Sequence, residues 1–208
     1  SWRGELFSNA INPDTGVLVE PPEWVAGNQL PDWNARNIHF HDPDGNNQSQ
    51  QHKLFTRGNL NADQRDEFGA NEASQTRVVN YLRGERSHEQ AEPGGTLRNR
   101  AGILGDIVHS EPVFVGQPNP RAFAGRSFTG SNLYASFVNA RAGRRPMVYV
   151  GANDGMLHGF DAASGVEQYA FIPHQVIMNG LADLASPEYE HRFFVDGELT
   201  QLEVYFSG

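Results

Sequence analysis

The segment 148–161 constrains the fold of this chain more than any other. Two extended runs of β-branched, aromatic and apolar residues flank the sequence Asn153-Asp154-Gly155. A tight turn between two strands needs residues that tolerate a positive φ, and Asn, Asp and Gly tolerate it best. The segment therefore predicts a β-hairpin, with Val148 and Val150 on one face and Tyr149 on the other.

A second turn and a third extended run follow directly. The sequence Asp161-Ala162-Ala163-Ser164-Gly165 has turn chemistry and precedes the run Glu167 to Ile172. Three strands joined by two tight turns make an antiparallel meander. At this spacing the turns Gly-x-Asn-Asp-Gly and Asp-Ala-x-Ser-Gly resemble those of a blade in a quinoprotein-type β-propeller.

Other stretches of the sequence predict further strands and several helices. Extended apolar runs predict strands, and helical spacing with capping residues predicts helices. Further strands are expected at 2–10, 17–20, 35–41, 112–116, 192–196 and 202–206. Helices are expected at 61–68, 71–83, 133–141 and 173–185, with Asn61 and Asn71 as N-caps and Gly84 after the second helix.

These elements predict an all-β chain with helical insertions near 61–100 and 173–185. Alternating strand and helix units of a parallel sheet are not apparent. We expect residues 1–208 to be a fragment of a single β-propeller domain, with two or three blades of four antiparallel strands, at roughly 40 to 50 residues per blade. Because both ends of the sequence read as strand, we expect neighbouring segments on both sides.

Charge and composition argue against several classes of function. The 16 basic and 25 acidic residues give a formal charge of −9. This balance argues against nucleic-acid binding, which needs basic patches, and against docking on anionic lipid. No apolar run is long enough to span a membrane. The absence of cysteine excludes a disulfide framework, a thiolate metal site and a cysteine nucleophile.

Three histidines and three aspartates lie in the most informative stretches. They are His109, His158 and His191, and Asp106, Asp161 and Asp196. The histidines lack the local spacing of a metal site, so hydrogen bonding within the fold is the favoured role and metal binding the alternative. The aspartates lie beside turns or strand ends, where they are expected to accept backbone N–H bonds and hold the corners of a blade. A catalytic carboxylate pair is the alternative, but no feature selects it.

The segment 42–47 superficially resembles an oxygen-rich calcium loop. An EF-hand-type loop needs Gly at its sixth position and Glu at its twelfth. Here Gly45 is fourth and Lys53 is twelfth. A plain turn is therefore expected, with calcium as the alternative.

The remaining chemical signals favour structural roles. Ser110 does not lie in a nucleophile elbow, and the segment 102–105 is not followed by the Gly-Lys-Ser/Thr of a phosphate loop. Trp2, Trp24 and Trp33 are expected to pack in the core or under loops, with a ligand-stacking platform as the alternative. We therefore predict no catalytic, cofactor-binding or metal-binding residue in this chain.

Several sequence runs together carry a family resemblance. They are 2–6, 81–84, 98–100, 104–110, 112–113, 150–161 and 191–197. In combination they resemble the C-terminal domain of the neisserial PilC-type family, the β-propeller of type IV pilus tip adhesin and assembly proteins. The resemblance covers most of the chain and corresponds to the N-terminal part of that propeller domain.

The resemblance implies binding and assembly rather than catalysis. Proteins of this family work at the bacterial outer surface and the pilus tip, support pilus assembly against retraction, and mediate attachment to surfaces or host cells. Pilus subunits (minor pilins) and a host or abiotic surface are the implied partners. The family propeller can bind calcium through a loop of the Asp-x-Asp-x-Asp-Gly kind. Residues 1–208 contain no such loop, so calcium is assigned to no residue here.

Two other functions stay open. Quinone (PQQ)-dependent dehydrogenases share the hairpin turns, but they often hold their quinone and metal with adjacent cysteines and a stacking Trp. This chain has no Cys, and its Trp residues all lie in the first 33 positions. A non-catalytic propeller scaffold in envelope assembly is the third class. Because function resides in sites rather than in folds, fold alone does not separate the three.

Overall fold

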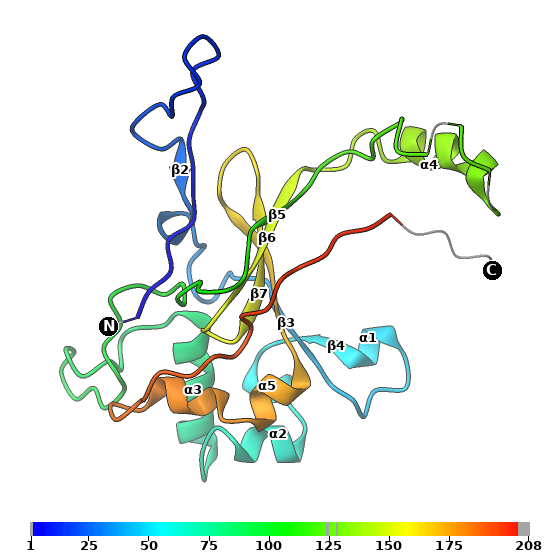
Figure 1. Cartoon of the computed structure of the whole chain (residues 1–208). Helices are drawn as coiled ribbons and strands as arrows, with labels where there is room; N and C mark the ends of the chain where they lie inside the picture. The colour runs from blue at the N-terminus through cyan, green and yellow to red at the C-terminus, as the bar shows by residue number, and fades with distance from the viewer. Residues whose placement is uncertain (1, 124, 128, 204–208) are drawn as a thin grey trace.

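The computed structural model describes residues 2–123, 125–127 and 129–203, and it is mostly β with helices set against one face of a twisted sheet (Figure 1). The small sheet pairs β1 (Phe7–Ser8) with β2 (Trp24–Val25). The large sheet has the order β4-β3-β8-β7-β6-β5. Its strands are β3 (Ile38–His41), β4 (His52–Leu54), β5 (Val113–Val115), β6 (Met147–Ala152), β7 (Met156–Asp161) and β8 (Glu167–Ile172).

Short helices join and cover these strands. The α-helices are α1 (Gln48–Gln51), α2 (Ala62–Asp66), α3 (Glu72–Arg83), α4 (Tyr134–Ala140) and α5 (His174–Met178). The 3-10 helices are η1 (Ala26–Asn28), η2 (Arg57–Asn59), η3 (Ser131–Leu133) and η4 (Leu181–Ala185). Within the described part of the chain, no helix is both long and apolar enough to cross a membrane.

The predicted meander is confirmed as β6, β7 and β8. Its first turn closes with Gly155 N–H donating to Ala152 C=O at 3.2 Å, and Gly155 has φ +87°. In the second turn the Asp161 carboxylate accepts the backbone N–H groups of Ala163 and Ser164 at 3.0 and 2.9 Å. These contacts explain why the two turn sequences specify a meander.

The strand count differs from the expected sheets of four strands. Strands β5 to β8 form an antiparallel meander of four strands, the unit predicted for a blade, but the hairpin of β3 and β4 extends it to six. Strand β3 pairs with β8 in parallel, with Ile38 opposite Ala170. Because the paired strands are so far apart in sequence, no local pattern signals this pairing. Strand β4 was not predicted.

The N-terminal strands also differ from prediction. The turn at 12–16 forms, and Ile11 bridges Leu18, but the segments 2–10 and 17–20 do not pair as full strands. Instead Phe7 in β1 pairs with Val25 in β2.

One predicted C-terminal strand is wrong, and the other lies mostly outside the described residues. Residues 192–196 are not a strand, because side chains rather than a neighbouring strand satisfy this backbone; Phe194 N–H, for example, donates to Asn153 Oδ1 at 3.0 Å. Of the strand expected at 202–206, residues 202 and 203 have no strand structure and the rest lie outside the described residues.

The predicted helices are present but shorter. Asn61 and Asn71 cap α2 and α3 with reciprocal capping boxes, and Gly84 ends α3 with φ +119°. The single helix expected at 173–185 is split into α5 and η4, because Gly180 has φ +88° between them. The helix expected at 133–141 is confirmed as α4, which η3 precedes.

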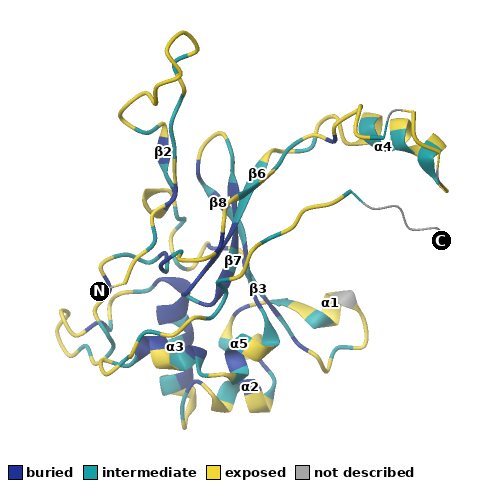
Figure 2. Ribbon diagram, viewed as in Figure 1, coloured by how far each residue is buried: buried dark blue, intermediate teal, exposed yellow. Residues whose placement is uncertain are grey.

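The core consists of two clusters on the same face of the large sheet (Figure 2). The larger cluster packs β3 and β8 against α3, α5 and η4, with Phe40 and Phe55 fully buried. The smaller packs β6 and β7 against the N-terminal segment and includes Val150, Phe160 and Trp24. Each fully buried side chain of this kind stabilises the fold by about 1.5–3 kcal/mol. On strand β7, His158 lies between the two clusters, two residues from Phe160.

Candidate functional site

The turn between β6 and β7 joins two polar clusters. Asn153 is buried, and its backbone N–H donates to Asp106 C=O at 3.0 Å. Asp154 Oδ2 accepts the N–H of Gly105 at 2.9 Å. A Cβ at Gly105 would lie 2.2 Å from Asp154 N, so only glycine permits this approach. The segment around Gly105 is therefore docked on the turn, with one polar cluster beneath it and another at the surface.

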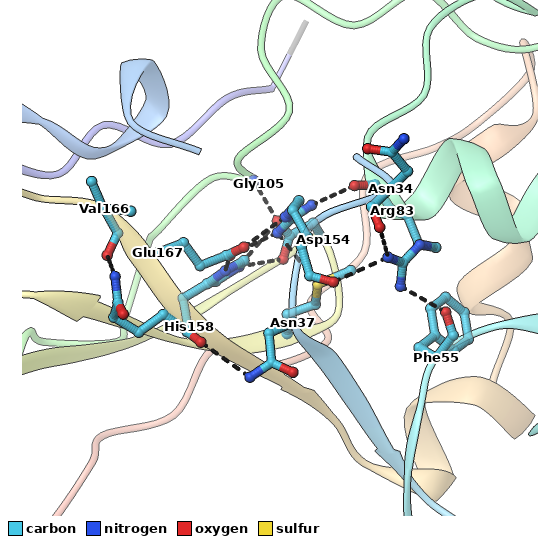
Figure 3. Close-up of polar contacts among 12 residues, drawn as sticks. Asn34, Asn37, Phe55, Arg83, Gly105, Asp154, His158, Val166 and Glu167 are labelled. Carbon is cyan, nitrogen blue, oxygen red and sulfur yellow. Dashed lines mark hydrogen bonds and ion pairs between the residues drawn. The ribbon is translucent and has the colours of Figure 1, made fainter. Parts of the chain in front are cut away.

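The inner cluster is a chain of buried charges centred on His158 (Figure 3). His158 Nδ1 lies 2.8 Å from Glu167 Oε1, and His158 Nε2 lies 3.0 Å from Asp154 Oδ1. Arg36 donates from Nε and Nη2 to the two oxygens of Glu167, each at 2.7 Å. Two carboxylates thus face one arginine and one histidine, and Glu167 is shared between them.

Pairing, not burial, sets the protonation of this cluster. Burial alone would lower the pKa of His158, but the facing carboxylates of Asp154 and Glu167 outweigh it and raise that pKa to about 9. Burial would raise the pKa of Glu167, but bonds from Arg36 and His158 outweigh it and lower that pKa to about 2. Burial would likewise raise the pKa of Asp154, and His158 overcomes it and lowers that pKa. The cluster is therefore charged at neutral pH, which suits a structural role rather than proton transfer.

Arg83 links this cluster to the helical insertion. Its Nη1 donates to Phe55 C=O at 2.9 Å and its Nη2 to Arg36 C=O at 3.0 Å. In return, Arg36 Nη1 donates to Arg83 C=O at 2.8 Å. Arg36 and Arg83 therefore fix the C-terminal end of α3 to the start of β3. Arg36 also bonds Glu167 in β8, so it joins α3, β3 and β8.

The outer cluster contains the other motif residues. His191 Nε2 lies 2.8 Å from Asp106 Oδ2, which also accepts from Asn153 Nδ2 at 2.9 Å. Asp196 accepts the backbone N–H groups of Val108 and His109 at 3.2 and 3.0 Å. It also contacts the His109 ring nitrogen Nδ1. Two His–Asp pairs thus hold residues 106–109 against 191–196.

A row of four rings, of which that of His191 is mostly buried and the other three are exposed, covers the outer cluster. The Trp2 and His191 rings lie 4.2 Å apart, His191 and Phe193 lie 5.0 Å apart, and Phe193 and His109 lie 5.5 Å apart, each distance joining ring centroids. Trp2 is 57% exposed and Phe193 is 60% exposed. We name these four residues the aromatic row. Exposed aromatic rings beside polar groups are the usual composition of a binding surface.

The hollow beneath the aromatic row is small. A cavity of about 30 Å³ lies between Trp2, Tyr81, Asp106 and Asn153. Such a volume holds one or two water molecules. It is an order of magnitude below the range of small-molecule sites. The cavity does not fit a quinone.

The sequence-predicted residues fall in different places. Asp161 accepts backbone N–H bonds within its own turn, as predicted. Asp196 also accepts backbone N–H bonds, but from the distant segment of Val108 and His109, and the Asp106 carboxylate bonds side chains instead. The three histidines do not come together in one site, because each pairs with different carboxylates. Within the described ranges, no group of three or more His, Cys, Asp or Glu side chains is arranged to hold a metal. Buried Ser110 accepts Gly151 N–H at 2.8 Å, a structural bond.

The other early candidates also have structural contacts. The segment 42–47 is a turn followed by α1, and Lys53 Nζ lies 2.5 Å from Asp42 Oδ2, where a calcium ligand would be needed. Trp24 is buried and donates to Ala162 C=O at 3.1 Å. Trp2 departs from the packing prediction, because it lies exposed on the aromatic row.

Sequence reasoning missed the residues that complete the inner cluster. Arg36 and Glu167 were not singled out, because neither belongs to a motif. The one available signal was a charged residue, Glu167, at the start of β8, a strand whose last four residues are aromatic or apolar. Such a residue is seldom buried without a partner.

Comparisons with known proteins point to the type IV pilus system. Residues 104–204 match the family model described as the PilY1 beta-propeller domain. A type IV pilus biogenesis factor PilY1 homolog of Xylella fastidiosa is 42% identical over 205 residues, which is 99% of this chain and 15% of that protein. The type IV pilus biogenesis factor PilY1 of Pseudomonas aeruginosa strain PAK is 34% identical over 222 residues, covering 100% of this chain and 18% of that protein.

The matches define a region rather than a whole protein. The chain spans only 15 to 18% of the length of these curated relatives. No solved structure matches it significantly. The family-model match begins before β5 and includes β5 to β8, the four-stranded meander. The family model and the relatives together support a type IV pilus PilY1/PilC-like propeller family for this chain, without singling out the neisserial PilC proteins.

Proposed function

We propose that this chain is part of a β-propeller that acts in type IV pilus assembly and in attachment, by binding and not by catalysis. The observation that carries the proposal is the match to PilY1 pilus biogenesis factors over nearly the whole chain. The proposed partners are pilus subunits, the minor pilins among them, together with a host or abiotic surface. The proposed location is the bacterial outer surface, at the pilus tip.

The site geometry favours binding over catalysis. The carboxylates of the inner cluster are paired with Arg36 and His158, so neither is available to a substrate. A group that exchanges protons needs a pKa near the working pH, whereas pairing moves the pKa of His158 and that of Glu167 away from neutrality. By contrast, three rings of the aromatic row, those of Trp2, His109 and Phe193, are exposed to solvent.

The proposal is tested in a bacterium that carries the full-length gene. Deleting the gene is expected to reduce the number of pili per cell, counted by electron microscopy, and the number of cells attached to glass. Complementation with the wild-type gene restores both. Undiminished piliation and attachment in the deletion strain would contradict the proposed function.

A variant of the aromatic row separates attachment from assembly. Trp2→Ser with Phe193→Ser in the full-length protein is expected to reduce attachment several-fold while pili still form. Ile11→Ser with Leu18→Ser is the matched control, because these apolar residues are 62% and 55% exposed outside the row. If the control reduces attachment as much as the aromatic variant, the row has no special role.

The quinone-dependent dehydrogenase is the competing function. Adding pyrroloquinoline quinone and calcium and following dye-linked alcohol oxidation tests it directly. Turnover above that of a heat-denatured sample would contradict a non-catalytic role. The possible calcium site of the family propeller stays a prediction for residues outside this chain.

A further inference from the structure

The segment between β5 and β6 differs in charge from the rest of the molecule. Residues 117–146, here called the arm, contain five arginines and no acidic residue. The whole chain has a formal charge of −9, so the residues outside the arm carry −14. Figure 1 shows the arm extending from the sheet, with α4 far from the helices that cover the core. A basic projection is thus attached to an acidic body.

Within the described part of the chain, ion pairs of the arm are found only at its base. Arg144 Nη2 lies 2.7 Å from Glu203 Oε1, and Arg145 Nε lies 3.5 Å from Asp161 Oδ2. The other three, Arg121, Arg126 and Arg141, are exposed. Among the residues that the structure describes, no carboxylate lies within ion-pair distance of these three. Carboxylates outside the arm therefore neutralise the positive charge at its base, whereas the positive charge of its outer part is not neutralised.

Aromatic packing gives the outer part a defined shape. The rings of Phe123 and Tyr134 meet edge to face with centroids 4.8 Å apart, and the rings of Tyr134 and Phe137 lie 5.9 Å apart. Tyr134 O–H donates to Asn119 C=O at 2.8 Å. Leu133 beside them is 46% exposed. The free arginines are thus presented next to partly exposed apolar side chains.

We propose that the arm is a docking element for an acidic surface on a partner protein. All five cations of the arm are arginine, whereas Lys53 in β4 is the only lysine in the chain. Arginine pairs with carboxylates through two parallel N–H bonds, and it stacks on aromatic rings. Arginine together with Tyr and Phe belongs to the composition that is enriched at protein–protein interfaces.

A protein fits this surface better than a lipid or a nucleic acid. Attraction to an anionic membrane takes clusters of about four to eight basic residues, and stable DNA binding neutralises about six to ten phosphates. The arm has three free arginines, and the −14 charge of the body opposes approach to an extended polyanion. A compact acidic patch, reached by the tip alone, avoids that repulsion.

This inference rests on the proposed function, because the partner is taken to be a component of the pilus system. The test uses the full chain and a defined probe, a synthetic peptide in which glutamates alternate with tyrosines. Binding is measured by fluorescence anisotropy at low and physiological salt. The arm variant is Arg121→Gln with Arg126→Gln and Arg141→Gln. Its control is Arg3→Gln with Arg65→Gln and Arg77→Gln, which changes net charge equally on the body.

The arm variant is expected to weaken peptide binding about tenfold or more, while the control keeps near wild-type affinity. Wild-type affinity is expected to fall as salt rises, and a peptide with serine in place of tyrosine is expected to bind more weakly. Circular dichroism confirms that both variants fold.

Several results would overturn the inference. They are equal affinities of the arm and control variants, tighter binding of duplex DNA or phosphatidylglycerol vesicles than of the peptide, and a dimer that only the arm variant abolishes. The last result would assign the arm to the acidic body of a second copy. These outcomes are separate from the proposed function, because gene deletion and pilus counts test that function without reference to the arm.

Discussion

His158 shows at the residue scale how one side chain can specify a blade. It lies on the core face of β7 and is fully buried between two carboxylates. Asp154 comes from the turn before it and Glu167 from the next strand, so three successive parts of the meander meet at one imidazolium. A charged histidine here stabilises the meander only while both carboxylates are in place.

The stability of the protein is expected to depend on pH through this histidine. The pKa of His158 is about 9 in the folded state against 6.5 unfolded, so its stabilising effect is complete below pH 6.5 and is lost as pH rises through 9. The pKa of Glu167 is about 2 against 4.5, so its effect is complete above pH 4.5 and is lost as pH falls through 2. Urea denaturation is expected to show a falling free energy of unfolding from pH 6.5 to 9.

His158→Gln removes the titrating group from the same network. The variant is expected to be less stable at pH 6 and to lose much less stability between pH 6.5 and 9 than the wild type. Asp154→Asn gives a second check, because it lowers the pKa of His158 and should move the transition to lower pH. Parallel pH profiles for all three proteins would show that His158 does not contribute as described.

Gly155 gives a second prediction at this scale. Its φ of +87° suits glycine, and a Cβ there would lie 2.4 Å from Leu181 Cδ1 and 3.1 Å from Val176 Cγ1. Gly155→Val is therefore expected to destabilise the protein by more than about 1 kcal/mol, through backbone strain and a clash with η4. Thermal unfolding followed by circular dichroism measures it. Gly143→Val is the control, since no atom lies within 4 Å of a Cβ there. If the Gly155→Val and Gly143→Val variants melt at the same temperature, the strain at Gly155 is refuted.

At the element scale, the pairing of β3 with β8 joins two parts of the chain that local sequence does not connect. Arg36 lies just before β3, and its two bonds to Glu167 fix that strand beside β8. Arg83 then fixes the end of α3 to the same place. The family-model match begins at residue 104 and so does not include β3, β4 and α3, whereas the PilY1 relatives match nearly the whole chain.

Arg36→Met tests whether the ion pair between Arg36 and Glu167 holds β3 beside β8. Removing one partner leaves Glu167 buried with less compensation, and such a loss costs about 3–5 kcal/mol. Amide hydrogen exchange is expected to rise most in β3 and β8. Arg77→Met in α3 is the control, since no ion pair of Arg77 is described. If exchange in β3 stays as slow as in the wild type, the ion pair does not hold the strand.

The elements that sequence predicted well are those with local causes. The turns at Gly155 and Gly165, and the caps at Asn61 and Asn71, depend on residues within a few positions of one another. The parallel pairing of β3 depends on a partner far along the chain. The predicted strand at 192–196 is unpaired and bends at residues 194 and 195, where the side chain of Asn153 takes the place of a neighbouring strand.

Local sequence likewise predicts only part of the candidate site. The motif residues Asp106, His109, His191 and Asp196 could be singled out from sequence, but not the pairs that they form. Those pairs join residues that are 85 and 87 positions apart, so only the fold brings them together. The exposure of Trp2 was also unpredictable, because an aromatic residue in a strand-like run reads as core.

At the scale of the whole molecule, the core clusters and their helices cover one face of the large sheet, whereas on the other face residues 199–202 line an open hollow with Tyr149 and Leu157. The core clusters occupy the face of Val150, Phe160 and Ile172, which are fully buried. On the other face Tyr149 and Phe171 are only partly buried. A blade buries both faces between neighbouring blades, so this face is expected to need a partner sheet.

The isolated chain is therefore expected to self-associate. Among the residues that the structure describes, the edge strand β5 pairs only with β6, and Phe114 in it is 63% exposed. Unpaired strand edges and uncovered apolar faces promote association. Light scattering over a range of protein concentrations measures the mass. A monomer at high concentration would contradict this expectation.

A structure of the longer natural protein, determined by electron cryomicroscopy, tests the central claim most directly. The account predicts that β5 to β8 form one blade of a ring, with Tyr149 and Phe171 buried against a neighbouring antiparallel sheet. A structure in which that face remains open to solvent, or in which β5 to β8 join a continuous sheet that does not belong to a ring, would contradict it.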